Sequence, residues 1–233
     1  MLITIQELRQ RFNIHVTGIL HVGAHKCEEL VQYLQLGVPK SNIYWIEALQ
    51  ELVDEMRQND RETKIYQAVI SETDNEVVTF NITRNDHTGD TQSSSILEFG
   101  SHATSHPQVK VVDKRMLLTS RLETVIAREQ IDMTTVNFMN LDIQGVELRA
   151  LKSMEQHLKH IKYIYTEVNT EQVYKGCDQM SDLTDYLSRF GFRLADKRIY
   201  SQFGWGDAFY IRGDPVSPQT RGDPVSPLTT FWT

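Results

Sequence analysis

A strand–helix–strand pattern near the N-terminus constrains the fold of this chain more than any other stretch. Residues 17–25 are largely apolar and rich in β-branched side chains, which predicts a buried strand that ends in a turn at Gly23. Residues 28–36 carry apolar side chains at helical spacing. Residues 43–47 then predict a second strand with an acid, Glu47, at its tip. This order predicts a βαβ unit.

Such a unit can hold a nucleoside. A glycine after the first strand lets the backbone approach a ligand closely, and a carboxylate at the tip of the second strand can accept hydrogen bonds from two ribose hydroxyls. The alternative is purely structural: Gly23 only ends a strand, and Glu47 only begins a helix.

The composition limits the class of protein. A length of 233 residues suits one α/β domain, which we expect to span residues 1–211. The formal net charge is −7 without a Lys/Arg block, so we expect no nucleic-acid partner. No apolar run approaches the roughly 20 residues of a membrane span, and no signal-peptide pattern opens the chain, which together predict a cytoplasmic protein. Cys27 and Cys177 form no zinc pattern, and a small buried thiol is expected at position 27.

Periodicity predicts the remaining elements. Helices are expected at 3–11, 52–58, 121–129, 146–157 and 181–190, the last capped by Ser181. Strands are expected at 64–70, 76–83, 109–112, 115–119, 135–142, 162–167, 192–194 and 208–211. We expect 64–70 to pair with 76–83, the segments 109–112 and 115–119 to be edge strands, and residues 204–207 to form a turn.

Two segments differ in character from the rest. Residues 84–108 are rich in Asn, Asp, His, Gly, Ser and Thr, which predicts a long polar loop able to act as a lid over a site. Residues 212–233 contain the nine-residue repeats 212–220 and 221–229 and four of the six prolines. This composition predicts an extended tail outside the core.

Four predicted strands end in residues suited to ligand binding: Gly23, Glu47, Asp142 and Glu167. In an open α/β sheet, ligands bind at the carboxyl ends of the strands. We therefore expect these four residues to converge on one crevice.

Several motifs in the chain resemble those of FkbM-type methyltransferases, including the glycan O-methyltransferase domains of large viruses. They occupy residues 21–25, 45–47, 67–71, 93–97, 141–151, 166–168 and 206–209. The resemblance implies a Rossmann-like class I α/β fold with a mixed seven-stranded sheet, helices on both faces and a reversed last hairpin. It also implies S-adenosylmethionine as cofactor and methyl transfer to an oxygen, commonly a sugar hydroxyl of a carbohydrate or glycoside acceptor. A viral source would place the protein in the host cytoplasm.

The resemblance also implies which residues hold the cofactor: His21, Gly23, Ala24, His25, Glu29, Glu47, Ala48, Ala68, Ser94 and Asp142. Two positions depart from the family pattern. His21 stands where an Asp is usual, and Cys27 stands where a Gly is usual. Because an imidazole cannot hold the cofactor's ammonium group as a carboxylate does, Glu28, Glu29 or backbone carbonyls are the candidate replacements.

The chemistry requires a group that manages the proton of the acceptor hydroxyl. Asp142 and Glu167 are predicted to bind Mg²⁺ or Mn²⁺, which would lower the pKa of that hydroxyl. Alternatively, Asp142 acts alone as general base, or it only caps the following helix. His106 is the third predicted catalytic residue and, with His102, could border the acceptor.

Two other functions fit parts of the same pattern. An NAD-binding oxidoreductase uses a similar βαβ unit but needs a fuller Gly-x-Gly-x-x-Gly motif, of which only Gly23 is present. A catalytically inactive nucleoside-binding module would explain the departures at His21 and Cys27.

Overall fold

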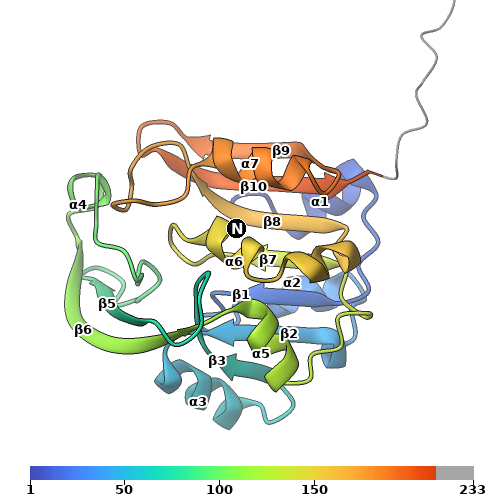
Figure 1. The fold of residues 1–233 in the computed structure, drawn as a ribbon, viewed down its shortest axis with the longest axis horizontal. Coiled ribbons are helices and arrows are strands. Elements are labelled where there is room, and N and C mark those ends of the chain that lie inside the picture. Colours follow the sequence, from blue (N-terminus) through green and yellow to red (C-terminus); the bar gives the residue numbers. More distant parts are fainter. Residues whose placement is uncertain (214–233) are drawn as a thin grey trace, which may run out of the picture.

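The computed structural model describes residues 1–213, which form a seven-stranded sheet with helices on both faces (Figure 1). The strand order is β3-β2-β1-β7-β8-β10-β9, and β10 alone runs antiparallel to its neighbours. The strands are β1 (Ile19–Val22), β2 (Ile43–Glu47), β3 (Lys64–Gln67), β7 (Phe138–Leu141), β8 (Tyr163–Asn169), β9 (Phe192–Tyr200) and β10 (Trp205–Arg212). The predicted mixed seven-stranded sheet, with helices on both faces and a reversed last hairpin, is confirmed.

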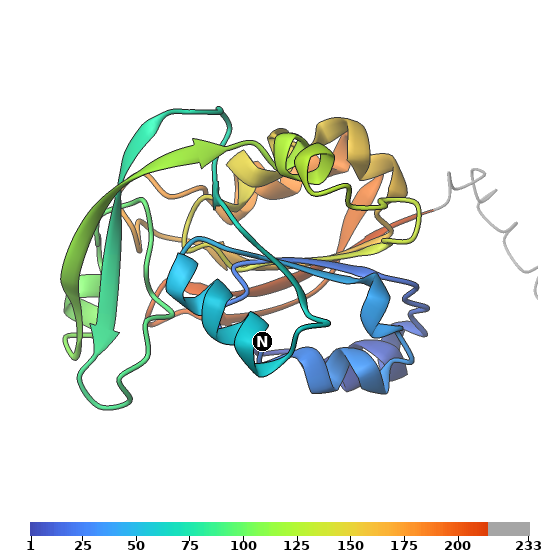
Figure 2. The same ribbon diagram turned by 90° about the horizontal axis from the view of Figure 1, so that it is seen from below.

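The helices pack on the sheet in two layers, which Figure 2 shows edge-on. One face is covered by α1 (Ile5–Phe12), α2 (Leu30–Gln35) and α3 (Gln50–Asn59), and the other by α5 (Leu122–Arg128), α6 (Glu147–Lys152) and α7 (Met180–Ser188). The short 3₁₀ helices η1 (Lys40–Asn42) and η2 (Glu155–His160) precede β2 and β8. Each layer buries its own hydrophobic core against the sheet.

The register of the central strands brings the predicted strand tips together. Val22 pairs with Ile46 and with Leu141, and Leu141 pairs with Thr166. Each of these residues directly precedes a predicted site residue, so Gly23, Glu47, Asp142 and Glu167 follow at the same edge of the sheet. The predicted convergence is confirmed.

A second, three-stranded sheet stands at one end of the large sheet (Figures 1 and 2). Its order is β4-β6-β5, with β4 (Val69–Ile70), β5 (Val77–Asn85) and β6 (Val109–Ser120). Three predictions are therefore wrong. The segment 64–70 is not one strand but divides between the two sheets, and β5 pairs with β6 rather than with 64–70. The two predicted edge strands at 109–112 and 115–119 are one strand, β6, in the centre of the small sheet. The chain bends at Ala68, whose N–H donates to the Glu47 carbonyl at 2.9 Å, and an apolar run does not reveal such a change of sheet.

Smaller differences concern the ends of elements. α6 stops at Lys152, and α7 begins after Gln179, so Ser181 is not its N-cap. β8 continues past Glu167 to Asn169, and residues 205–207 belong to β10. The polar segment 84–108 contains α4 (His102–Ser105). β10 runs one residue beyond the predicted domain boundary at 211, and residues 214–233 of the predicted tail lie outside the described part of the chain.

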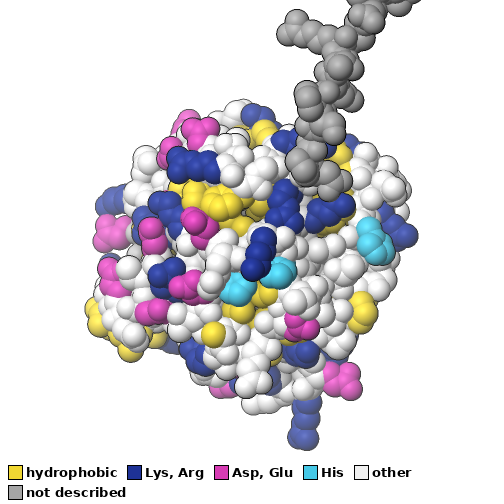
Figure 3. All heavy atoms as spheres, turned by 45° about the vertical axis from the view of Figure 1, so that its right-hand side comes forward, with side chains coloured by type: hydrophobic (Ala, Val, Ile, Leu, Met, Phe, Trp, Pro, Cys, Tyr) yellow, Lys and Arg dark blue, Asp and Glu magenta, His cyan; other side chains and the backbone are white. Residues whose placement is uncertain are grey.

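The surface carries mixed charge. On the face drawn in Figure 3, Lys and Arg side chains are distributed with Asp and Glu between them. Among residues 1–213, no helix has the length and apolar character that crossing a membrane requires.

Candidate active site

All the predicted site residues line one cavity of about 390 Å³ at the carboxyl ends of the sheet strands. They are His21, Gly23, Ala24, His25, Glu29, Glu47, Ala48, Ala68, Ser94, His106, Asp142 and Glu167. The lining also contains residues that the sequence did not single out, including Gln144, Tyr174, Trp205 and Asp207.

Glu47 is held at the tip of β2 by backbone donors. The His25 N–H donates to Glu47 Oε2 at 2.8 Å, and the Leu49 N–H donates to Oε1 at 2.9 Å. Burial raises the pKa of this carboxyl, against the lowering effect of those hydrogen bonds. Each oxygen keeps a second lone pair, so the carboxylate can still accept from two ligand hydroxyls.

Gly23 is required where the ends of two neighbouring strands meet. A Cβ at this position would lie 1.8 Å from the carbonyl oxygen of Asp142, and the backbone φ is +91°. The glycine therefore lets two neighbouring strand ends meet, in a conformation that other residues rarely adopt. The Gly23 and Ala24 N–H groups donate to the Ile46 carbonyl at 2.9 and 3.0 Å, which fixes the turn.

His21 is a buried, neutral side chain rather than a charged ligand. Its ring is tilted over Trp45 at 4.8 Å, and Nδ1 lies 3.1 Å from Tyr33 Oη. Asn140 Nδ2 donates to the same hydroxyl at 2.7 Å, which leaves the phenol hydrogen for His21. Burial lowers the pKa of His21 to about 4. The carboxylate nearest the ring is that of Glu29, 3.9 Å from Nδ1, and it is a candidate for the missing acid.

Cys27 is an inert thiol at the start of the turn into α2. It is buried and unpaired with another cysteine, and burial raises its pKa to about 12. The thiolate is therefore not populated near neutral pH, and Cys27 serves as the small buried residue that the sequence predicted.

The side of the cavity beyond Glu47 is apolar. Leu49, Leu52, Val69 and Phe80 form a small hydrophobic cluster there, with Ala48 packed against it. Ala68 lies next to this cluster at the end of β3. A flat apolar slot beside a carboxylate suits a heteroaromatic base attached to a ribose.

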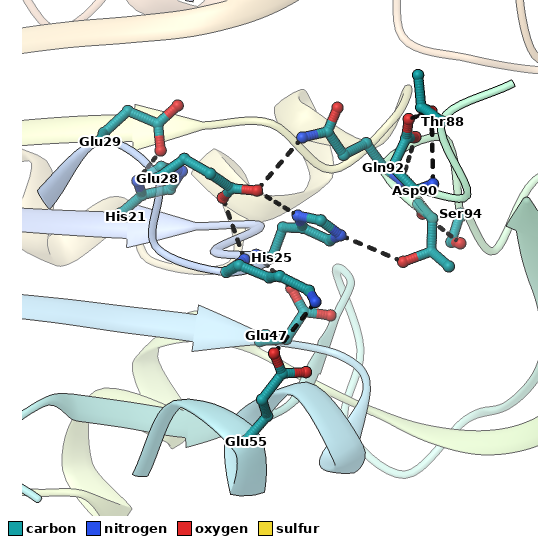
Figure 4. A network of polar contacts seen from close by, with 12 residues as sticks. His21, His25, Glu28, Glu29, Glu47, Glu55, Thr88, Asp90, Gln92 and Ser94 are labelled. Carbon is teal, nitrogen blue, oxygen red and sulfur yellow. Dashed lines mark hydrogen bonds and ion pairs between the residues drawn. The ribbon is translucent and has the colours of Figure 1, made fainter. Parts of the chain in front are cut away.

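A polar network joins the turn after β1 to the long loop (Figure 4). His25 Nδ1 lies 2.6 Å from Glu28 Oε1, and His25 Nε2 lies 3.3 Å from Thr91 Oγ1. Gln92 Nε2 donates to Glu28 Oε1 at 3.4 Å. Burial opposes the charge of His25, but the hydrogen bond and charge of Glu28 raise its pKa overall. The network holds the loop against the turn after β1, on the side of the cavity where Glu47 lies.

Asp142 and Glu167 meet as predicted, and Gln144 lies between them. Gln144 Nε2 donates to Asp142 Oδ1 and to Glu167 Oε2, both at 2.5 Å, while Tyr174 Oη donates to Gln144 Oε1. Asp142 is exposed to the cavity, whereas Glu167 is buried. Burial, the charge of Asp142 and a hydrogen bond with it raise the pKa of Glu167 well above its usual range. This environment favours the protonated form of Glu167, next to the more exposed carboxyl group of Asp142.

The loop that carries Gln144 is held by hydrogen bonds to Glu147, at the start of α6. Its Oε1 accepts hydrogen bonds from the Ile143 and Gly145 N–H groups, both at 3.1 Å. Gln144 itself has a positive φ of 57°. This carboxyl is buried, and burial raises its pKa. Its role in holding the loop could not be read from the spacing of the motif.

The Asp142–Glu167 pair does not fit a resident metal ion. Within residues 1–213, no group of three or more His, Cys, Asp or Glu side chains is arranged to hold one. An amide N–H₂ group lies between the two carboxyls, where a cation would have to bind, and its orientation is fixed by the Tyr174 hydroxyl. The amide donates to both carboxyls, and the raised pKa of Glu167 favours its protonated form, so both features lessen the repulsion between the two groups.

Asp207 is a further buried acid in the cavity. Its Oδ2 accepts from the Leu2 N–H at 2.5 Å and from Tyr165 Oη, and Tyr165 Oη in turn accepts from the Ile3 N–H at 3.0 Å. Asp207 thereby ties the N-terminal segment to the sheet, and Leu2 becomes part of the cavity lining. The sequence suggested a turn here and gave no sign of this contact.

The electrostatic character of the cavity is acidic. Its lining includes Glu28, Glu29, Glu47, Asp90, Asp142, Glu167 and Asp207, and it includes no Lys or Arg of the described chain. Such a site favours a cationic ligand and disfavours phosphate groups.

Comparison with known proteins identifies the family of the chain. The family model described as the methyltransferase FkbM domain matches residues 21–194. A search of curated proteins returned no match.

Solved structures share the fold at low identity. A methyltransferase FkbM from Methylobacillus flagellatus is 14% identical with a TM-score of 0.51, over 84% of this chain and 43% of that one. This chain thus spans less than half of that relative. Magnesium protoporphyrin IX methyltransferase from Synechocystis, with bound SAM, is 10% identical with a TM-score of 0.46, over 88% and 74% of the two chains.

Proposed function

Because the chain belongs to the FkbM methyltransferase family, we propose that it transfers the methyl group of S-adenosylmethionine to a sugar hydroxyl. The observation that carries the proposal is the single cavity that joins Glu47 and its apolar slot to the exposed carboxylate of Asp142. The first part suits the nucleoside of the cofactor, and the second suits a group that accepts a proton.

The cofactor is a cation at neutral pH, because the sulfonium and the ammonium group outweigh its carboxylate. A cavity lined by seven acids, without Lys or Arg from the described residues, supports binding of such a ligand. Glu29 is the best candidate for the ammonium group, since His21 is neutral and packed against Trp45. Glu47 would accept from the ribose hydroxyls.

The proposed reaction is an in-line displacement. The acceptor oxygen forms a bond to the methyl carbon, the sulfur–methyl bond breaks, and its electron pair remains on sulfur as a neutral thioether. The hydroxyl proton passes to Asp142, the exposed member of the pair. Gln144, which donates to both Asp142 and Glu167, holds the carboxyl group of Asp142 in position.

The scheme uses no metal ion, because Gln144 donates to both carboxyls and the raised pKa of Glu167 favours its protonated form beside Asp142. The NAD-dependent alternative fits poorly. A pyrophosphate would have to lie at the start of α2, where Glu28 and Glu29 place two carboxyl groups.

The test is methyl transfer from labelled S-adenosylmethionine to a panel of methyl glycosides, with EDTA or with added Mg²⁺. We expect labelled O-methyl glycoside and rates that agree within about twofold under the two conditions. Product only with Mg²⁺ would establish the metal-assisted mechanism instead. Cofactor binding without transfer to any acceptor would indicate an inactive binding module.

A further inference from the structure

The far side of the cavity is formed by a wall of aromatic rings that the cofactor assignment does not use. It comprises His102 at the start of α4, His106 directly after α4, Phe203 from the β9–β10 turn and Trp205 at the start of β10, together with Phe99 and Tyr174, which pack against His102. His102, His106, Tyr174 and Trp205 line the same cavity as Asp142.

This aromatic wall is fixed in place. The Gly100 and His102 N–H groups donate to the Val173 carbonyl at 2.9 and 3.1 Å. A Cβ on Gly100 would lie 2.0 Å from the Gln172 carbonyl oxygen, so only glycine permits this approach. The α4 segment is therefore hydrogen-bonded to the chain that follows β8. This contact holds the rings of His102 and His106 in place at the cavity.

The rings form a continuous apolar surface. His102 stacks on Phe99 with ring centres 4.3 Å apart, and His106 lies 4.9 Å from His102. His106 also lies 4.9 Å from Phe203 and 6.3 Å from Trp205. A surface of this kind matches the C–H face of a pyranose ring, whose hydroxyls project around the edge.

Both histidines have hydrogen-bonding capacity that the protein does not use. The Nδ1 atoms of His102 and His106 are buried and have no partner among residues 1–213. His102 is only 6% exposed. Buried polar atoms are rarely left unpaired, so the two rings point to a ligand that supplies the missing partners. Burial lowers the pKa of both, for His102 to about 4, and each neutral ring offers one donor and one acceptor.

The charge of the surroundings limits that ligand further. No Lys or Arg of the described chain lines the cavity, and burial lowers the pKa of both His102 and His106. His25 and the Met1 amino group, which also line it, interact with Glu28 and Glu29. A phosphorylated, sulfated or carboxylated sugar would therefore find no Lys or Arg and would face Asp142 and Asp207.

We propose that the aromatic wall is the acceptor subsite and that it selects an uncharged glycoside, stacked on the rings and hydrogen-bonded by His102 and His106. This inference rests on the proposed function and adds the class of acceptor to it. His106, predicted as a catalytic residue, thereby becomes a residue that positions the acceptor.

The experiment compares methyl glycosides with their 6-phosphates as acceptors, in wild type and in His102→Phe and His106→Phe. Phenylalanine keeps the stacking and removes the ring nitrogens. His157→Phe, in η2 and outside the cavity, is the matched control. We expect the phosphates to have at least 100-fold lower kcat/KM. We also expect each cavity variant to raise the glycoside KM about tenfold with little change in kcat, and S-adenosylhomocysteine affinity to be unchanged in all variants.

A second measurement keeps the inference falsifiable if turnover is slow. In histidine-labelled protein saturated with S-adenosylhomocysteine, the ring signals of His102 and His106 should shift on adding the glycosides and remain unmoved by the phosphates. The acceptor assignment would be overturned if phosphates were used as well as glycosides, if KM were unchanged in both variants, or if no glycoside shifted the signals. If the wild type did not bind S-adenosylhomocysteine at all, the proposed function itself would be overturned.

Discussion

The part of the cavity at the ends of β1, β2 and β3, here the cofactor half, and the aromatic wall beside α4 are built in opposite ways. In the cofactor half, two backbone N–H groups donate hydrogen bonds to the carboxylate of Glu47. Two further backbone hydrogen bonds fix the Gly23 turn. In the aromatic wall, two buried ring nitrogens have no partner within residues 1–213. The polar groups of the cofactor half already have hydrogen-bond partners within the protein. Those of the aromatic wall obtain their partners from the ligand.

Asp142 and Glu167 lie where the two halves meet. Replacing each carboxyl group by the corresponding amide should affect the reaction to different extents. Asp142→Asn removes the exposed proton acceptor, so we expect kcat to fall at least about 100-fold, with S-adenosylhomocysteine binding nearly unchanged. Steady-state kinetics and calorimetry measure the two effects. Asp185→Asn, an exposed carboxylate outside the cavity, is the control.

Glu167→Gln should have a much smaller effect, because its surroundings raise the pKa of the native carboxyl and favour the neutral form that glutamine mimics. The amide keeps a donor for Asp142, and we expect kcat to fall less than about tenfold. A loss as large as that of Asp142→Asn would show that Glu167 ionises during the reaction, and the proposed division of roles would be wrong.

The network of His25, Glu28 and Thr91 predicts a smaller, pH-dependent effect in the cofactor half. Glu28 favours the charged form of His25, so the contribution of this pair is complete below the ordinary His pKa of 6.5 and is lost as pH rises through the higher pKa of the folded protein. Despite its burial, the hydrogen bond from His25 lowers the pKa of Glu28, which stays ionised throughout this range.

We therefore expect S-adenosylhomocysteine to dissociate a few-fold faster at pH 8.5 than at pH 6, by stopped-flow measurement. His25→Gln should remove most of this pH dependence. His87→Gln, an exposed residue of the same loop, should retain it. An unchanged pH profile in His25→Gln would mean that the network does not control the loop.

The two halves also differ in how far the sequence predicted them. Glu47 ends β2, Asp142 directly follows β7, and Glu167 lies two residues before the end of β8. Because parallel strands align their carboxyl ends, the position of each acid could be inferred from local pattern alone. The role of Gln144 could not, because a polar residue in a turn gives no periodic signal.

The aromatic wall depends on contacts between distant segments. α4 is fixed by Val173, some seventy residues further along the chain, and the polar composition of 84–108 conceals both the helix and its aromatic surroundings. The same limit applies to Asp207, whose partners Leu2 and Tyr165 are adjacent only in the folded chain. Long-range pairing of this kind leaves no pattern in a single sequence.

Calorimetric titration of S-adenosylhomocysteine into wild type and Glu47→Ala tests the central claim most directly. The account predicts micromolar binding at one site, weakened in the variant by about 1.5–3 kcal/mol, or roughly 10- to 150-fold, because a charged acceptor for the ribose is lost. Glu51→Ala, an exposed acid in α3 outside the cavity, should bind like wild type. Absence of binding by the wild type, or equal affinity in a folded Glu47→Ala variant, would contradict the account.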